Sequence, residues 1–63
     1  MIYLIEKPSG RKAYYSFRRL LQEENIEEIC KKYGDTIPAR NTLPVRIASD
    51  QIVIMKVEVD ERL

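Results

Sequence analysis

The stretch Ile26-Glu27-Glu28-Ile29-Cys30-Lys31-Lys32-Tyr33-Gly34 decides the fold of this chain. Its apolar residues stand at positions 26, 29, 30 and 33, the i, i+3, i+4, i+7 spacing that lines one face of an α-helix. Asn25 precedes the stretch and can cap a helix, and Gly34 can end one in the left-handed conformation. The sequence therefore predicts a short amphipathic helix whose stripe packs on a core.

A second helix is predicted just before this stretch. Ser16 is suited to cap a helix that starts with residues 17–21. If that helix ran on without a break, Glu24 and Glu28 would lie on its apolar stripe. We therefore predict a break near Asn25, whose side chain caps the second helix while Glu28 reaches back in a capping box.

The N-terminal residues predict a β-hairpin. Residues 2–6 are rich in β-branched and aromatic side chains. After the turn signal Lys7-Pro8-Ser9-Gly10, the residues Ala13, Tyr15 and Phe17 alternate with Lys12, Tyr14 and Ser16. Two registers remain open, because either Ile2 and Leu4 or Tyr3 and Ile5 can face the core.

The C-terminal third predicts a second hairpin. Apolar residues recur with a period of two from Val45, a polar turn follows at residues 49–51, and residues 52–59 form a longer arm. Four of its side chains share one face: Val53, Met55, Val57 and Val59. Residues 52–55 are apolar on both faces, which indicates a central strand. Residues 60–63 are expected to fray.

Residues 35–44 lie between the helices and the second hairpin and show no clear period. Pro38 and Pro44 limit any helix there, so we expect an irregular segment with a short helical or 3₁₀ turn. The sequence thus predicts one α+β domain, residues 1–63. Its order is β-hairpin, two short helices, irregular or 3₁₀ segment and C-terminal β-hairpin.

Composition favours a small globular protein inside the cell. The chain has 63 residues, of which 44% are hydrophobic and 33% charged, and no apolar run reaches the roughly 18 residues that a membrane span requires. Residues 1–5 lack the basic start and long apolar run of a secretory signal, so we interpret them as part of the fold. The single Cys30 cannot form an internal disulfide, which is typical of a reducing compartment. We expect a cytoplasmic protein.

Catalysis is not expected from these residues. The sequence has no histidine, and its two glycines, Gly10 and Gly34, form no phosphate-binding loop. Cys30 occupies an apolar helix position, where a buried and inert thiol is the usual case. We therefore expect no enzyme, no cofactor, no metal site and no small-molecule substrate.

The charges are arranged in blocks although the formal net charge is only +1. Residues 1–19 carry five basic side chains against Glu6 alone, residues 20–30 are acidic, and residues 31–46 are basic again. Such a chain can present a basic face while it stays near neutral overall.

Residues 26–34 resemble the first helix of a helix-turn-helix. The matching features are an apolar residue, two polar ones, an apolar and a small residue, a basic pair, an apolar residue and glycine. The resemblance implies a small winged-helix-like domain in which residues 36–43 form the recognition element and residues 45–59 the wing. Asp35 departs from the pattern because an apolar residue is usual there, and Pro38 interrupts the expected helix. The first hairpin and helix also resemble small proteins of bacterial phages and mobile elements.

The function implied by this resemblance is regulation of transcription through binding to double-stranded DNA. The residues that would contact phosphates are Arg18, Arg19, Lys31 and Lys32. Arg40 and Asn41 would reach base edges, because arginine pairs with guanine and asparagine with adenine in the major groove. Arg46 would lie on the wing. The near-zero net charge argues against this function, since nucleic-acid-binding domains are usually basic.

Two other functions fit the same sequence. Arg11, Lys12, Tyr14 and Tyr15 of the first hairpin interleave basic and aromatic side chains, a composition that can stack bases and hold phosphates, although tyrosines in strands are more often packing residues. The second is an interaction or inhibitory module. It would act through a sheet edge, residues 45–48 or 2–6, or as a homodimer. Salt separates nucleic-acid binding, which weakens steeply as salt rises, from an apolar protein interface.

Overall fold

The computed structural model describes residues 1–58, and its elements follow the predicted order. They are β1 (Ile2–Lys7), β2 (Gly10–Tyr14), α1 (Phe17–Glu23), α2 (Ile26–Tyr33), the 3₁₀ turn η1 (Arg40–Thr42), β3 (Val45–Ile47) and β4 (Ile52–Val57). The predicted α+β class, with two hairpins around two short helices and a 3₁₀ segment, is confirmed. Val59 and residues 60–63, which the sequence assigned to the last strand and to a frayed end, lie outside the described residues.

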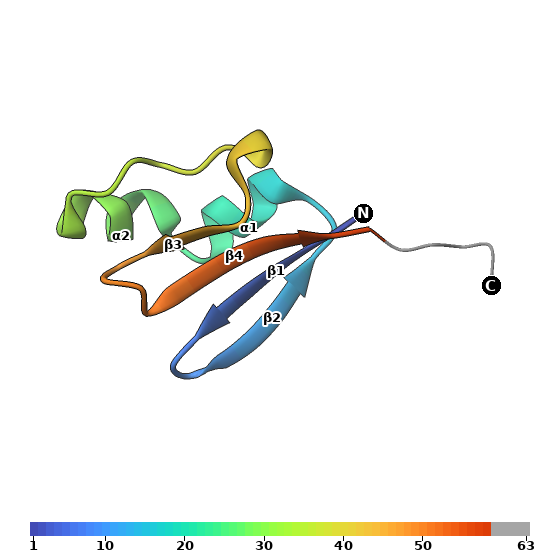
Figure 1. Ribbon diagram of the computed structural model, residues 1–63, viewed down its shortest axis with the longest axis horizontal. Coiled ribbons are helices and arrows are strands. Elements are labelled where there is room, and N and C mark those ends of the chain that lie inside the picture. The colour runs from blue at the N-terminus through green and yellow to red at the C-terminus, as the bar shows by residue number, and fades with distance from the viewer. Residues whose placement is uncertain (59–63) are drawn as a thin grey trace.

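The four strands form one antiparallel sheet in the order β2-β1-β4-β3 (Figure 1). The prediction that residues 52–55 belong to a central strand is confirmed, because β4 pairs with β1 on one side and β3 on the other. The prediction that residues 2–6 offer a free sheet edge is wrong. β4 returns to pair along β1 and occupies that edge, so the edges belong to β2 and β3.

Tyr3 and Ile5, not Ile2 and Leu4, face the core, which settles the register of the first hairpin. Tyr3 is 4% exposed and Ile5 is fully buried. The Tyr3 ring packs against Phe17 of α1 with its centroid 5.4 Å away, a tilted arrangement that aromatic pairs favour. Of the two possible faces of β1, the one with the larger side chains, Tyr3 and Ile5, thus packs beneath the helices.

Both helices and η1 lie on the same side of the sheet (Figure 1). The core forms between that side and the helices, and its fully or nearly fully buried members are Tyr3, Ile5, Leu20, Ile26, Cys30, Ile47, Ala48, Ile52 and Ile54. The burial of Ile26 and Cys30 confirms that the predicted stripe of α2 faces the core. Burial also raises the pKa of the Cys30 thiol, which keeps it protonated and inert.

Three predictions about the ends of the helices are confirmed, and one is wrong. The Arg19 amide donates a hydrogen bond to Ser16 Oγ at 3.3 Å, so Ser16 caps α1 as predicted. The break at Asn25 is also confirmed, and Gly34 ends α2 with φ +74°. The predicted cap of α2 is wrong, because Asn25 adopts a left-handed φ of 53° and its side chain makes no capping hydrogen bond. A capping side chain needs extended backbone at that position.

Strand β2 ends at Tyr14, so the predicted alternation through Tyr15 and Phe17 does not continue the strand. Tyr15 lies between strand and helix, and Phe17 starts α1. A hydrogen bond connects the segment after α2 to the second hairpin: the Ala48 amide donates it to Asp35 Oδ2 at 2.9 Å.

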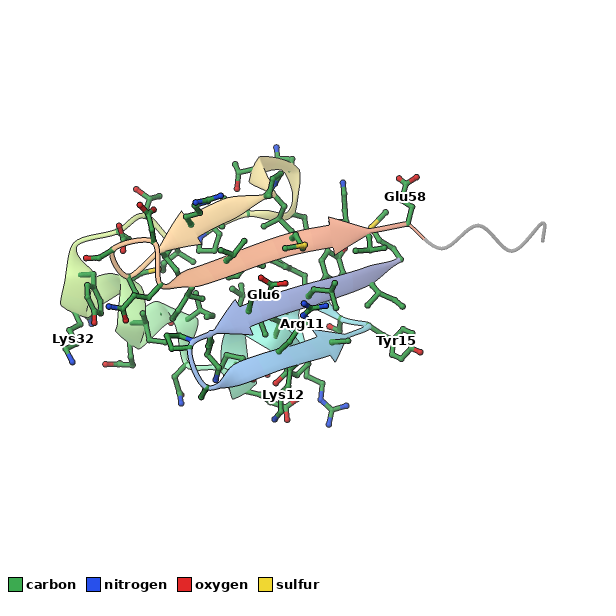
Figure 2. The ribbon with its side chains drawn as sticks, turned by 60° about the horizontal axis from the view of Figure 1, so that its bottom comes forward. Glu6, Arg11, Lys12, Tyr15, Lys32 and Glu58 are labelled. Carbon is green, nitrogen blue, oxygen red and sulfur yellow. The ribbon has the colours of Figure 1, made fainter. Side chains whose placement is uncertain are left out.

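Within residues 1–58, no element covers the side of the sheet away from the helices, and Figure 2 views the molecule from that side. We call it the open face. Strand alternation and register place on it Ile2, Leu4, Glu6, Arg11, Ala13, Arg46, Val53, Met55 and Val57. Neither helix has the length and apolar composition needed to cross a membrane, within the part of the chain that the structure describes.

The β3–β4 turn holds three consecutive non-glycine residues with positive φ: Ala48, Ser49 and Asp50. Left-handed backbone costs an L-residue about 1–2 kcal/mol. We predict that Ser49→Gly raises the free energy of unfolding by about 0.5–1 kcal/mol, measured by urea denaturation. Ser9→Gly is the control. Ser9 lies in the other hairpin turn without positive φ, so glycine there should lower stability, and a gain at both positions would contradict the explanation.

Candidate nucleic-acid interface

The structure brings together three of the seven residues predicted to contact DNA, places Asn41 beside one of them, and separates the other three. Arg18 and Arg19 lie at the start of α1, and Arg40 lies on η1, close to the end of β2. We call this surface the corner and define it by Lys12, Tyr15, Arg18, Arg19 and Arg40.

Tyr15 is the centre of the corner. Its side chain is 86% exposed, and Figure 2 shows it projecting away from the body of the protein beyond the end of β2. A shallow hollow lies on either side of it. Tyr15 and Ser16 line both hollows, so the exposed ring stands on the ridge between them.

Cations surround both hollows. Arg18 and Arg40 line the hollow of about 490 Å³, together with Tyr3 and Phe17. Lys12 and Arg19 line the other, of about 370 Å³. Arg19 is held by Glu23 at 2.5 Å, whereas Lys12, Arg18 and Arg40 make no ion pair with any described residue. The corner therefore offers, around one exposed aromatic ring, three positive charges that no described residue pairs with.

Three of the other predicted contact residues lie elsewhere, and Asn41 lies beside the corner. Lys31 and Lys32 occupy the last turn of α2, near the two hairpin turns, and Lys32 Nζ lies 5.8 Å from the centroid of the Tyr33 ring. Figure 2 labels Lys32 and Tyr15 at opposite ends of the protein. Arg46 lies on the open face. Asn41 is exposed on η1 next to Arg40.

The segment that the helix-turn-helix resemblance makes a recognition element holds no α-helix. Within residues 36–43 the only regular structure is the three-residue turn η1, which is closed where the Ala39 amide donates to Thr42 Oγ1 at 3.1 Å. Pro38 is buried in the stretch before it. Arg40 and Asn41 are thus presented by a turn, and the resemblance itself stays a prediction.

Glu24 stabilises the part of the fold that carries the corner. Its carboxylate is 4% exposed and accepts hydrogen bonds from Lys7 Nζ at 2.5 Å and from the Tyr14 hydroxyl. These contacts join β1, the end of β2 and the end of α1. With Tyr14 fixed inward by this bond, the next residue, Tyr15, leaves the strand and points outward.

The same contacts shift two pKa values. The hydrogen bond from Lys7, followed by that from Tyr14, lowers the pKa of Glu24 despite its burial. The hydrogen bond to Glu24, with desolvation, raises the pKa of Tyr14 to about 12. Both shifts keep a carboxylate and a neutral phenol at neutral pH, which is the state that the hydrogen bond needs.

Sequence reasoning placed Glu24 on an apolar stripe and inferred a helix break there. The break exists, but Glu24 is buried all the same, because Lys7 of β1 and Tyr14 of β2 pair with it. The exposure of Tyr15 was also missed. The position of Tyr15 directly before the helix cap Ser16 could have indicated its exposure, because a strand has to end before the helix begins.

No protein-family model, no curated protein and no solved structure matches the chain. The function therefore has to be inferred from the geometry of the surfaces. Within residues 1–58, no three side chains of His, Cys, Asp or Glu lie close enough together to hold a metal ion.

We predict that Glu24→Gln lowers the free energy of unfolding by about 1–3 kcal/mol at pH 7, because an amide replaces a buried, charge-assisted acceptor. The folded-state pKa of Glu24 lies below its ordinary value of 4.5, so its stabilisation is present above pH 4.5 and disappears as the pH falls through the lowered value. Urea denaturation between pH 7 and pH 3 measures both effects.

Glu23→Gln is the matched control, because Glu23 is the neighbouring residue and makes an exposed i, i+4 pair with Arg19. Its removal should change stability by less than about 0.5 kcal/mol. An equal effect of the two substitutions, or an unchanged acid dependence in Glu24→Gln, would show that Glu24 has no special part in stability.

Proposed function

We propose that this protein binds nucleic acid at the corner and that it takes a single-stranded segment there. The observation that carries the proposal is the exposed Tyr15 ring, which stands between two hollows with the cations Lys12, Arg18 and Arg40 around it. We further propose that it acts as a small regulatory protein in the cytoplasm.

Each part of the corner has a matching group in a nucleic acid. Arginine and lysine side chains hold phosphate oxygens, and guanidinium groups do so with two hydrogen bonds at once. A tyrosine ring open to solvent can stack on the face of a base, an interaction worth about 1–3 kcal/mol per base. Arg18 and Arg40 lie on different segments, so they can hold successive phosphates while the base between them rests on Tyr15.

A single strand suits this surface better than a duplex. Base faces in a duplex are already stacked and cannot reach Tyr15, whereas an unpaired base can. Reading a duplex through the major groove takes an α-helix or a two-stranded ribbon, and the segment around Arg40 and Asn41 is a three-residue turn. Double-stranded DNA, the ligand expected from the sequence, would meet only the cations.

The near-neutral net charge is compatible with local binding. About three phosphate contacts at Lys12, Arg18 and Arg40 predict that the logarithm of the binding constant falls by about 2 per tenfold rise in salt for a single strand. This slope is shallow compared with that of strongly basic proteins, and the binding is expected to be weak.

We predict that Tyr15→Ala weakens binding of a mixed-sequence oligonucleotide of about 12 nucleotides by about 5- to 150-fold, because one stacking contact is lost. Tyr15→Phe keeps the ring and should bind like the unsubstituted protein. Fluorescence anisotropy with single-stranded and duplex probes, at about 50 mM and about 200 mM salt, measures both.

Tyr33→Ala is the control, because Tyr33 is an exposed tyrosine of α2 far from the corner, at the end marked by Lys32 in Figure 2. It should bind unchanged. Absence of binding to any probe at low salt would overturn the proposal, as would equal binding by Tyr15→Ala and the unsubstituted protein.

A further inference from the structure

The open face has charged residues at one end and apolar residues over the rest. Strand register aligns Arg11, Glu6, Val53 and Arg46 in one row across the sheet. The next row holds Ala13, Leu4 and Met55, and the last holds Ile2 and Val57. Val57 is 38% exposed. Leu4, Val53 and Met55 are half-buried, and none of the described elements packs over them.

Glu6 and Arg46 are placed symmetrically about β4. Both are register partners of Val53, Glu6 on the β1 side and Arg46 on the β3 side. Neighbouring strands lie about 4.8 Å apart, so each charge stands one strand to either side of the line through Val53, Met55 and Val57.

We infer that the open face binds a second copy of this chain, related by a two-fold axis that lies between the two sheets and bisects the directions of their β4 strands. This axis places β4 of one copy over β4 of the other, and β1 of each over β3 of its partner. Glu6 then faces the partner's Arg46, and Arg46 faces the partner's Glu6. The valines and the methionine of β4 stack on their own counterparts, which is the self-complementarity that a two-fold interface requires.

The distances suit this arrangement. Two sheets pack face to face about 10 Å apart and about 30° from parallel. Glutamate and arginine side chains together can bridge such a gap. Because both charges lie only about 4.8 Å to either side of the axis, the angle between the sheets moves them by only a few ångströms. Leu4 comes over the partner's Pro44, which lines a hollow of about 370 Å³ with Val53 and Met55.

The two edges of the sheet are poorer places for a second copy. The β2 edge carries Arg11 and Lys12, and pairing β2 with its own copy would bring these charges together. The β3 edge has only three strand residues, and Pro44 directly before them has no amide to donate. The face therefore offers the better contact, and the corner on the helix side stays open in the dimer.

The size of the face implies a weak dimer. Only β1, β4 and β3 overlap, and three strands of up to six residues cover roughly 14 Å by 20 Å, about 300 Å² of each copy, which is smaller than most stable interfaces. We expect the dimer to form between about 10 μM and about 1 mM protein.

Charge reversal tests the inference by sedimentation velocity over this concentration range. Glu6→Arg places two arginines opposite each other at both contacts, and Arg46→Glu does the same with two glutamates. Each variant alone should dimerise about tenfold more weakly or worse, because like charges face each other across the interface. An equal mixture of the two variants should dimerise again, because every contact then joins opposite charges.

Lys31→Ala is the control, because Lys31 is an exposed cation in the last turn of α2, on the helix side of the sheet and away from the open face. It should leave the dimer unchanged. A protein that stays monomeric at about 1 mM would overturn the inference, and so would a mixture that does not restore the dimer. Circular dichroism of each variant shows that it is folded.

Discussion

The pairing of β1 with β4 is the constraint on which the rest of the structure depends. Ile5 and Ile54 stand directly opposite each other in this pair, and both are fully buried. The contact joins two hairpins that are each only marginally stable alone into one four-stranded sheet. It also gives the sheet one side broad enough for both helices, which fixes the open face on the other side.

The local elements followed from the sequence because their signals are local. The spacing of Ile26, Ile29, Cys30 and Tyr33, with Gly34 after them, is sufficient to predict α2, and the apolar run from Ile52 is sufficient to predict a central strand. Turn residues placed both hairpins. These features depend on neighbours within a few positions, which a single sequence displays.

The remaining features depend on contacts between distant segments. Whether Tyr3 or Leu4 faces the core is decided by Phe17, and the burial of Glu24 is decided by Lys7 and Tyr14. Of the candidate site, the sequence named Arg18, Arg19 and Arg40, but their meeting around Tyr15 depends on the fold placing Arg40 of η1 and Arg18 of α1 at the same hollow. Hydrophobic periodicity and secondary-structure propensity carry no information about contacts between residues that are far apart in the sequence.

The β1–β4 contact also has a consequence for how the chain is synthesised. Its partners are about 50 residues apart, so the two central strands cannot pair until residues 52–57 have left the ribosome. Until then, the nascent β1 carries Ile5 without its partner and exposes an unpaired edge. Until residues 52–57 are available, residues 1–51 are therefore expected to stay largely unfolded and open to chaperones.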